Sequence, residues 1–324
     1  MLPPVASVED LSIAFPMDDG THRAVNGVSL AVSENEIFGI VGESGSGKSV
    51  TCLALAGLLP EKAMLSGRIT LGGKSYPASA LRKVNRHALP PIGIVFQEPT
   101  ACLNPVRTIG SQLIETAIAG GMTRQQAAAE SVRLLERVGI ANARERMNAY
   151  SSEFSGGMCQ RVMIAMALAM QPRLIIADEP TTALDVTVQA QVVALLSEVV
   201  RERGIPMIFI SHDLDLIAET CDRVAVMYSG AVVEVGDTGV LYNSPSHPYT
   251  KLLIDAMPGR TESRQRLADI PGEIQPMSRP PTSCSFAMRC PRVLPGCRSM
   301  LPQMEQFHGR SIACMNPWRA DVVQ

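Results

Sequence analysis

The sequence predicts an α/β fold built on a parallel β-sheet. Short apolar runs that are typical of strands buried on both faces recur at 37–41, 92–96, 174–177 and 207–211. Helical patterns separate these runs at 49–59, 126–140 and 187–204. Strands that alternate with helices favour a parallel sheet, and ligands of such a sheet lie beyond the carboxyl ends of its strands.

The chain has 324 residues, more than the roughly 250–300 residues at which a single hydrophobic core stops growing. We therefore expect one large domain, residues 1–254, with a helical subdomain at about 100–170. Prolines become frequent after residue 245 and strong periodicity disappears. Residues 255–324 should accordingly form a small, loop-rich C-terminal extension.

Composition and charge narrow the class of protein. Apolar residues make up 46% of the chain and charged residues 19%, which is typical of a soluble globular protein. The formal net charge of −2 gives no global electrostatic reason to bind nucleic acid. Residues 1–15 lack the basic patch and apolar run of a signal peptide, and no apolar run approaches the roughly 20 residues of a membrane span. We therefore expect a cytosolic protein.

The first apolar run leads into GESGSGKS, residues 42–49, which fits the P-loop pattern G-x-x-x-x-G-K-S/T between a strand and a helix. Glycines let successive backbone N–H groups point at phosphate oxygens, and the helix adds its positive end. Lys48 should reach the β- and γ-phosphates, and the Ser49 hydroxyl should bind Mg²⁺. The remaining predicted nucleotide contacts of this loop come from Gly42, Ser44, Gly45 and Gly47.

A P-loop requires a second carboxylate for Mg²⁺, at the end of a neighbouring strand. The run at 174–177 leads to Asp178, which should hold Mg²⁺ through water, and to Glu179, which could act as general base. Two further runs end at Gln97 and His212. Because parallel strands end at one edge of a sheet, the residues expected to converge are Lys48, Gln97, Asp178, Glu179 and His212.

The segment FSGGMCQR, residues 154–161, opens a predicted helix of the helical region. Ser155, Gly156 and Gly157 would present a hydroxyl and bare N–H groups at a helix N-terminus, which is a second anion-binding device. One nucleotide does not need both a P-loop and a second anion-binding helix N-terminus. The segment is explained if it caps the γ-phosphate of a nucleotide held by another subunit.

With these motifs in this order, residues 5–250 resemble the ATP-binding subunits of ABC transporters. The matching segments are the P-loop 42–49, the Q-loop residue Gln97, the signature 154–161, the Walker B segment 174–179, the D-loop Ala183-Leu184-Asp185 and the switch residue His212. One departure is Phe154, where the family usually has leucine. The resemblance implies a P-loop NTPase fold of the ABC type and ATP hydrolysis, with catalytic roles for Lys48, Gln97, Glu179 and His212.

In that family two subunits sandwich two ATP molecules, and each signature faces the partner's P-loop. The resemblance therefore implies that Ser155, Gly156 and Gly157 act in trans and that Asp185 lies at the nucleotide. It also implies that Ser49, Gln97 and Asp178 surround Mg²⁺. An aromatic residue near the first strand stacks on adenine in this family, and Phe15 holds that place. Phe15 could instead be a plain core residue.

Two segments, 95–110 and 244–253, look like the peptide-import branch, with the greatest similarity to the dipeptide-permease ATPase of the D type. Relatives in this branch import oligopeptides, nickel chelates, glutathione or opines. Their importers combine two homologous ATPases, two membrane permeases and an extracytoplasmic solute-binding protein. The resemblance implies a heterodimeric ATPase pair on the cytoplasmic face of the inner membrane, with residues 100–150 receiving a permease helix.

Four of the eight cysteines, Cys284, Cys290, Cys297 and Cys314, lie close together in the C-terminal extension. Disulfides are uncommon in the cytosol, so the spacing favours metal or redox chemistry. Zinc usually takes paired ligands about two to four residues apart, which are absent here, whereas iron–sulfur clusters accept more varied spacing. The resembled type can hold a 4Fe–4S cluster on four similarly placed cysteines. We favour that cluster; zinc and a metal-free module are the alternatives.

Two other functions compete with transport. A soluble ABC ATPase that works on DNA or ribosomes would usually carry long coiled coils or two tandem ATPase units, and the sequence shows one P-loop and no basic stripe. A non-hydrolysing regulatory partner would have a degenerate site, whereas Lys48, Asp178 and Glu179 are intact. An ATPase that powers import of peptides is the favoured function, and a nickel chelate, glutathione or an opine are alternative solutes.

Overall fold

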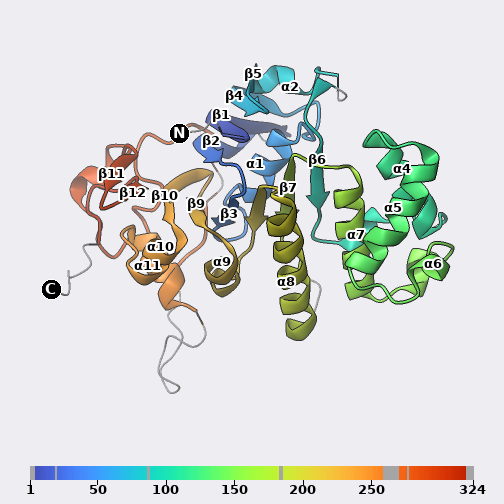
Figure 1. Cartoon of the computed structure of the whole chain (residues 1–324). Helices are drawn as coiled ribbons and strands as arrows, with labels where there is room; N and C mark the ends of the chain where they lie inside the picture. Colours follow the sequence, from blue (N-terminus) through green and yellow to red (C-terminus); the bar gives the residue numbers. More distant parts are fainter. Residues whose placement is uncertain are drawn as a thin grey trace.

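The structure is a computed structural model that describes residues 4–18, 20–85, 88–181, 185–257, 270–275 and 277–318. Within this part of the chain the strands form two sheets, and most helices pack around the larger one (Figure 1). The larger sheet has the strand order β11-β12-β10-β9-β3-β8-β7-β6. Its parallel strands are β3 (Ile37–Val41), β6 (Ile92–Val95), β7 (Leu174–Asp178), β8 (Met207–Ile210) and β9 (Arg223–Tyr228).

The predicted α/β fold is confirmed. Strand β3 lies between β8 and β9 and is buried along its whole length, as its uninterrupted apolar sequence predicts. On the β8 side of β3, the strands follow in the order β8, β7 and β6, with β6 at the edge of the sheet. Each of the four predicted apolar runs is therefore a strand of one parallel array, and their carboxyl ends share an edge.

The smaller sheet was not predicted from the sequence. It is antiparallel, and its order β2-β1-β4-β5 joins β1 (Ala6–Met17), β2 (Gly20–Val32), β4 (Met64–Leu71) and β5 (Lys74–Pro77). Its apolar residues, with those of helix α1 (Lys48–Leu55) and of one face of the large sheet, form one buried core. Helix α1 therefore starts at the P-loop and ends within a hydrophobic layer.

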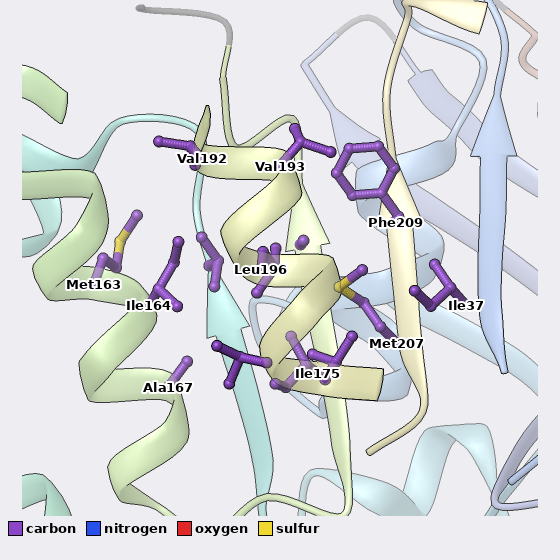
Figure 2. Close-up of a cluster of buried hydrophobic side chains, with 14 of the residues drawn as sticks. Ile37, Met163, Ile164, Ala167, Ile175, Val192, Val193, Leu196, Met207 and Phe209 are labelled. Carbon is purple, nitrogen blue, oxygen red and sulfur yellow. The ribbon is translucent and has the colours of Figure 1, made fainter. Parts of the chain in front are cut away.

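Three helices cover the other face of the large sheet: α7 (Gly156–Ala169), α8 (Val186–Arg203) and α9 (Leu214–Thr220). Figure 2 shows Val193 and Leu196 of α8 between Ile164 of α7 and the side chains of β8. Burial of several such side chains, each worth about 1.5–3 kcal/mol, holds the helices on the sheet. The strand ends that carry the polar residues are fixed by this packing.

A group of helices lies to one side of the large sheet (Figure 1). It contains α3 (Pro99–Cys102), α4 (Ile109–Ala119), α5 (Arg124–Arg137), α6 (Ala143–Arg146) and α7. Helix α5 begins two residues before the predicted 126–140 because Thr123 and Gln126 form a capping box. It ends three residues early, where Gly139 adopts φ +77°.

The last described elements include three strands, β10, β12 and β11, that extend the large sheet, together with two helices and a turn. They are β10 (Ala231–Asp237), α10 (Thr238–Asn243), α11 (Pro248–Asp255), a 3₁₀ turn (Pro295–Arg298), β11 (Glu305–Phe307) and β12 (Arg310–Ile312). Strand β12 pairs antiparallel with β10, through Glu234 with Ile312 and Val235 with Ser311. The short helix α2 (Ala78–Leu81) packs on β4. The division of the chain at residues 254 and 255 stays a prediction.

Candidate functional site

The P-loop joins β3 to α1 by a backbone path that requires glycine. At Gly42, φ is +152° and an added Cβ would lie 2.2 Å from the carbonyl oxygen of Met227. At Gly47, φ is +95° and an added Cβ would lie 2.5 Å from the carbonyl oxygen of Ala24. Ser44 and Gly45 are exposed at the tip. The loop is thus held closely at both ends and presents an open tip to solvent.

Lys48 is the first residue of α1 and is buried. Its Nζ donates hydrogen bonds to the carbonyl oxygens of Gly42 (2.8 Å) and Glu43 (3.0 Å). Burial lowers the pKa of Lys48, while the carboxylates of Glu179 and Asp178 act in the opposite direction. The ammonium therefore lies beneath the loop tip, close to the acidic end of β7.

Ser49 and Asp178 meet although they lie 129 residues apart in the chain. The Ser49 hydroxyl donates a hydrogen bond of 2.8 Å to Oδ1 of Asp178. Burial raises the pKa of Asp178, and the hydrogen bond from Ser49 lowers it. A hydroxyl beside a carboxylate is a suitable pair of oxygen donors for Mg²⁺.

Glu179 and His212 also lie together. Nδ1 of His212 is 3.3 Å from Oε2 of Glu179, and the His212 side chain is 61% exposed. The N–H of Glu179 donates to the carbonyl oxygen of Ile210 at 3.0 Å, which ties the end of β7 to β8. Glu179 has φ +44°, an unfavourable conformation for a residue with a side chain. Strain of this kind is concentrated at functional sites.

Two predicted residues are less closely joined to this group. Gln97 lies two residues beyond β6, beside β7, and its side chain is exposed; among the described residues it makes no hydrogen bond with Ser49 or Asp178. Phe15 lies on β1 and is half-buried, with part of its ring against the core between the two sheets. The exposed part of the Phe15 ring is accessible to a ligand such as the adenine base.

The signature segment lies at the start of α7. Ser155 is the N-cap of that helix and accepts a hydrogen bond from the Met158 N–H at 3.3 Å. Ser155 and Gly156 are exposed, and a Cβ on Gly157 would lie 2.8 Å from Cγ1 of Val188. The N-terminus of the helix is therefore open to an anion from outside the chain.

Asp185 of the D-loop is exposed and caps α8 by accepting a hydrogen bond of 3.0 Å from the Val188 N–H. Its role in the structure is thus at least that of a helix cap. The other two D-loop residues, Ala183 and Leu184, lie outside the described residues.

The four clustered cysteines line one small cavity, together with His247, Phe286 and Arg292. All are free thiols. Backbone N–H groups donate to two of the sulfurs, from Arg292 to Cys290 and from Asn316 to Cys314, both at 3.4 Å. Burial raises the pKa of Cys314 to about 11, so the metal-free thiol is protonated at neutral pH.

Among the residues that the structure describes, no group of three or more His, Cys, Asp or Glu side chains is placed to hold a metal ion. The 4Fe–4S cluster is therefore not confirmed. The four thiols nevertheless line the same cavity.

Two contacts at the P-loop were missed by the sequence analysis. The Glu43 N–H donates to the hydroxyl of Tyr249 at 2.9 Å, and the Glu43 carboxylate pairs with Arg289 at 3.0 Å. The partners lie 206 and 246 residues away in the chain. No local pattern could have indicated them.

No helix among the residues described here has the length and apolar character needed to cross a lipid bilayer. The structure brings one group of predicted polar residues together at the carboxyl edge of the large sheet: Lys48, Ser49, Asp178, Glu179 and His212.

Comparisons with known proteins agree with this geometry. The family described as "ABC transporter" matches residues 25–182, and the family described as "Oligopeptide/dipeptide transporter, C-terminal region" matches residues 233–297. The chain is 43% identical over 312 residues to the oligopeptide transport ATP-binding protein OppD of Escherichia coli, covering 96% of this chain and 93% of that one. It is 42% identical over 321 residues to a probable peptide ABC transporter ATP-binding protein, y4tR, of Sinorhizobium fredii, covering 98% and 95%.

Further similarity extends to the dipeptide transport ATP-binding protein DppD of Escherichia coli, which is 38% identical over 315 residues and covered to 96% in both chains. Among solved structures, cbiO1 of the ABC transporter complex cbiONQ from Clostridium perfringens has a TM-score of 0.61 and 29% identity, covering 74% of this chain and 91% of that one. The dimeric bacterial ABC transporter cassette MJ0796 has a TM-score of 0.62 and 25% identity, covering 72% and 98%. The P-loop, the two acids at the end of β7 and these similarities together show that the chain is an ATP-hydrolysing subunit that belongs to the ABC transporter family.

Proposed function

We propose that this chain powers the import of dipeptides or oligopeptides across the inner membrane by hydrolysing ATP. One observation carries the choice of solute: over 96–98% of its length the chain is similar to ATP-binding proteins named for peptide transport. The C-terminal match to the oligopeptide/dipeptide region supports the same choice. The arrangement of the strand ends supports the chemistry.

The roles of the residues follow from their positions. Lys48 beneath the P-loop would bind the β- and γ-phosphates, and Ser49 and Asp178 would hold Mg²⁺, with Gln97, two residues beyond β6, as a further ligand. The Glu179 carboxylate would take the proton of the attacking water as general base. His212, whose Nδ1 is 3.3 Å from that carboxylate, would orient it. Mg²⁺, when bound, neutralises the charge that develops on the phosphate oxygens.

The remaining predicted contacts involve a second subunit or the base. Ser155, Gly156 and Gly157 would bind the γ-phosphate held by a homologous ATPase, because two of them are exposed at a helix N-terminus. Asp185 would lie at the interface between the two subunits. Phe15 would stack on adenine, a contact worth about 1–3 kcal/mol. We propose a heterodimer of two homologous ATPases.

The partners would be two membrane permeases and an extracytoplasmic solute-binding protein. We propose that the helices within residues 100–150 and the segments that connect them receive a permease helix, because the helices stand beside the sheet and the connecting segments carry the exposed Val106 and Tyr150. The chain would therefore be peripheral, on the cytoplasmic face of the inner membrane. No nucleic acid is expected.

The transporter assembled in proteoliposomes tests this proposal by its phosphate release and by its uptake of a labelled dipeptide. Glu179→Gln should keep ATP binding and reduce both rates about 100-fold or more, because it removes the general base. The control is Glu219→Gln, the same change at an exposed position of α9. Unchanged phosphate release in Glu179→Gln would contradict the assignment of the base. Uptake of a nickel chelate, glutathione or an opine in place of the dipeptide would contradict the solute.

We also propose that the cysteine-lined cavity takes a 4Fe–4S cluster that staples the C-terminal extension. Four sulfur donors around one cavity, two of them accepting N–H hydrogen bonds, suit such a cluster. The cluster would require Cys284, Cys290, Cys297 and Cys314 to lose their protons on binding. A small module with little core benefits from a staple of this kind.

Metal analysis of protein purified without oxygen tests the cluster. We expect about four irons and four acid-labile sulfides per chain, lost in Cys290→Ser and retained in Cys102→Ser, whose cysteine is exposed and distant in sequence. Zinc in place of iron would contradict the cluster and show that the four cysteines bind a structural zinc ion. Neither metal would mean that the extension folds by packing alone.

A further inference from the structure

Arg289, next to one of the cavity cysteines, connects the C-terminal extension to the P-loop. Its Nη1 donates hydrogen bonds to Oε2 of Glu43 at 3.0 Å and to the hydroxyl of Tyr228 at 3.3 Å. Its Nε and Nη2 donate to the carbonyl oxygens of Pro271 (2.7 Å) and Ile270 (3.0 Å). Only 7% of the Arg289 side chain is exposed. The guanidinium is therefore held in one position by four acceptors.

Glu43 is held from three directions. Its N–H donates to the Tyr249 hydroxyl at 2.9 Å, its carbonyl oxygen accepts from Lys48 Nζ at 3.0 Å, and its carboxylate pairs with Arg289. Glu43 directly follows Gly42, so its position helps to set the path of the loop over Lys48. The pair with Arg289 is the part of this arrangement that the C-terminal extension supplies.

The negative charge of Glu43 opposes the binding of phosphate. Its carboxylate lies in the loop that receives the phosphates, and its Oε1 is buried with no hydrogen-bond partner among the described residues. An uncompensated carboxylate there would repel the triphosphate, and the repulsion is stronger than in water because the site is partly buried. Arg289 compensates this charge. A lysine could supply the charge but not the fork of hydrogen bonds to four acceptors.

We propose that Arg289 is a positioning residue for nucleotide binding: from the C-terminal extension it holds Glu43 and compensates its charge, so that the P-loop accepts ATP. This role of Arg289 is additional to the proposed function. It depends neither on which solute is imported nor on a metal in the cysteine-lined cavity. It gives the extension a direct part in ATP affinity.

The experiment compares ATP dissociation constants, together with KM and kcat for ATP hydrolysis, in the assembled transporter. Arg289→Gln should raise the Kd and the KM about tenfold, because a charge-assisted contact is lost, while kcat changes much less. Arg289→Lys should raise the Kd and the KM about threefold, because lysine supplies the charge without the fork of hydrogen bonds. Arg298→Gln is the matched control, an exposed arginine that also adjoins a cavity cysteine. It should leave the three quantities unchanged.

A second substitution separates charge compensation from a merely structural role. Glu43→Gln added to Arg289→Gln removes the uncompensated carboxylate and should restore most of the ATP affinity. If Arg289 only kept the extension folded, the double variant would bind ATP as weakly as Arg289→Gln. That result would overturn the proposal, as would an unchanged Kd in both Arg289→Gln and Arg289→Lys. Should Arg289→Gln fail to fold, Arg289→Lys with and without Glu43→Gln gives the same comparison.

Discussion

The nucleotide edge of the sheet and the C-terminal extension are held in place in different ways. At the nucleotide edge, Asp178 and His212 lie at or just beyond the ends of parallel strands whose burial is nearly complete, and Lys48 follows strand β3 through the P-loop. The described elements of the extension are short, and two of them are strands of three residues. Backbone geometry positions the first region, whereas buried polar side chains hold much of the second.

Glu234 of β10 shows how the second region is attached. Its carboxylate is fully buried and accepts hydrogen bonds of 2.9 Å from the N–H groups of Ser246 and His247. It also pairs with Arg310 of β12 at 3.4 Å. His247 in turn caps α11 by accepting from the Tyr249 N–H, and burial lowers the pKa of His247 to about 3, which keeps it neutral. One acidic side chain therefore joins a strand, a helix N-terminus and the extension.

The largest effect should come from breaking this attachment. Glu234→Ala leaves the Arg310 guanidinium buried without its carboxylate and two N–H groups without an acceptor. We expect the free energy of unfolding to fall by about 3–5 kcal/mol, as measured by denaturant titration. Glu305→Ala, an exposed glutamate on β11, is the control and should change it by less than about 0.5 kcal/mol. A loss below about 1 kcal/mol in Glu234→Ala would remove the distinction between the two regions.

An intermediate effect is expected where the two regions meet. Tyr249→Phe removes the acceptor of the Glu43 N–H while keeping the buried ring. The unfolding free energy should fall by about 1–2 kcal/mol, because one buried donor loses its partner. Tyr242→Phe is matched to it, since the Tyr242 hydroxyl donates to Asp215 at an exposed position. Equal losses of unfolding free energy in the two variants would show that the buried contact with the P-loop stabilises the protein no more than the exposed contact with Asp215.

The smallest effect should come from a partly exposed ion pair within one helix. Lys251 and Asp255 of α11 form an ion pair one turn apart, with about a third of each side chain exposed. Lys251→Ala should lower the unfolding free energy by about 0.5 kcal/mol or less, because solvent screens the pair. The same denaturant titration measures it. A loss above about 1 kcal/mol would mean that a partly exposed ion pair contributes as much to stability as a buried one in this region.

Much of the fold was predictable because buried parallel strands leave a simple pattern. The four apolar runs correspond to β3, β6, β7 and β8, and the three predicted helices between them correspond to α1, α5 and α8. The antiparallel sheet was missed because its pattern is interrupted: β1 shifts register between Val8 and Leu11, where Asp10 adopts φ +48°. Such irregularities destroy the period of two on which strand prediction depends.

What the sequence by itself determined is the local chemistry of the nucleotide site. Gly42, Gly47 and Lys48 belong to one short motif, and Asp178 and Glu179 follow directly on a buried strand, so chain order and burial bring them to one edge. Only the tertiary structure decided what lies against that motif. Arg289 reaches Glu43 across 246 residues and Arg310 reaches Glu234 across 76. Both contacts depend on where the chain returns, and single charged residues far apart leave no periodic signal in the sequence.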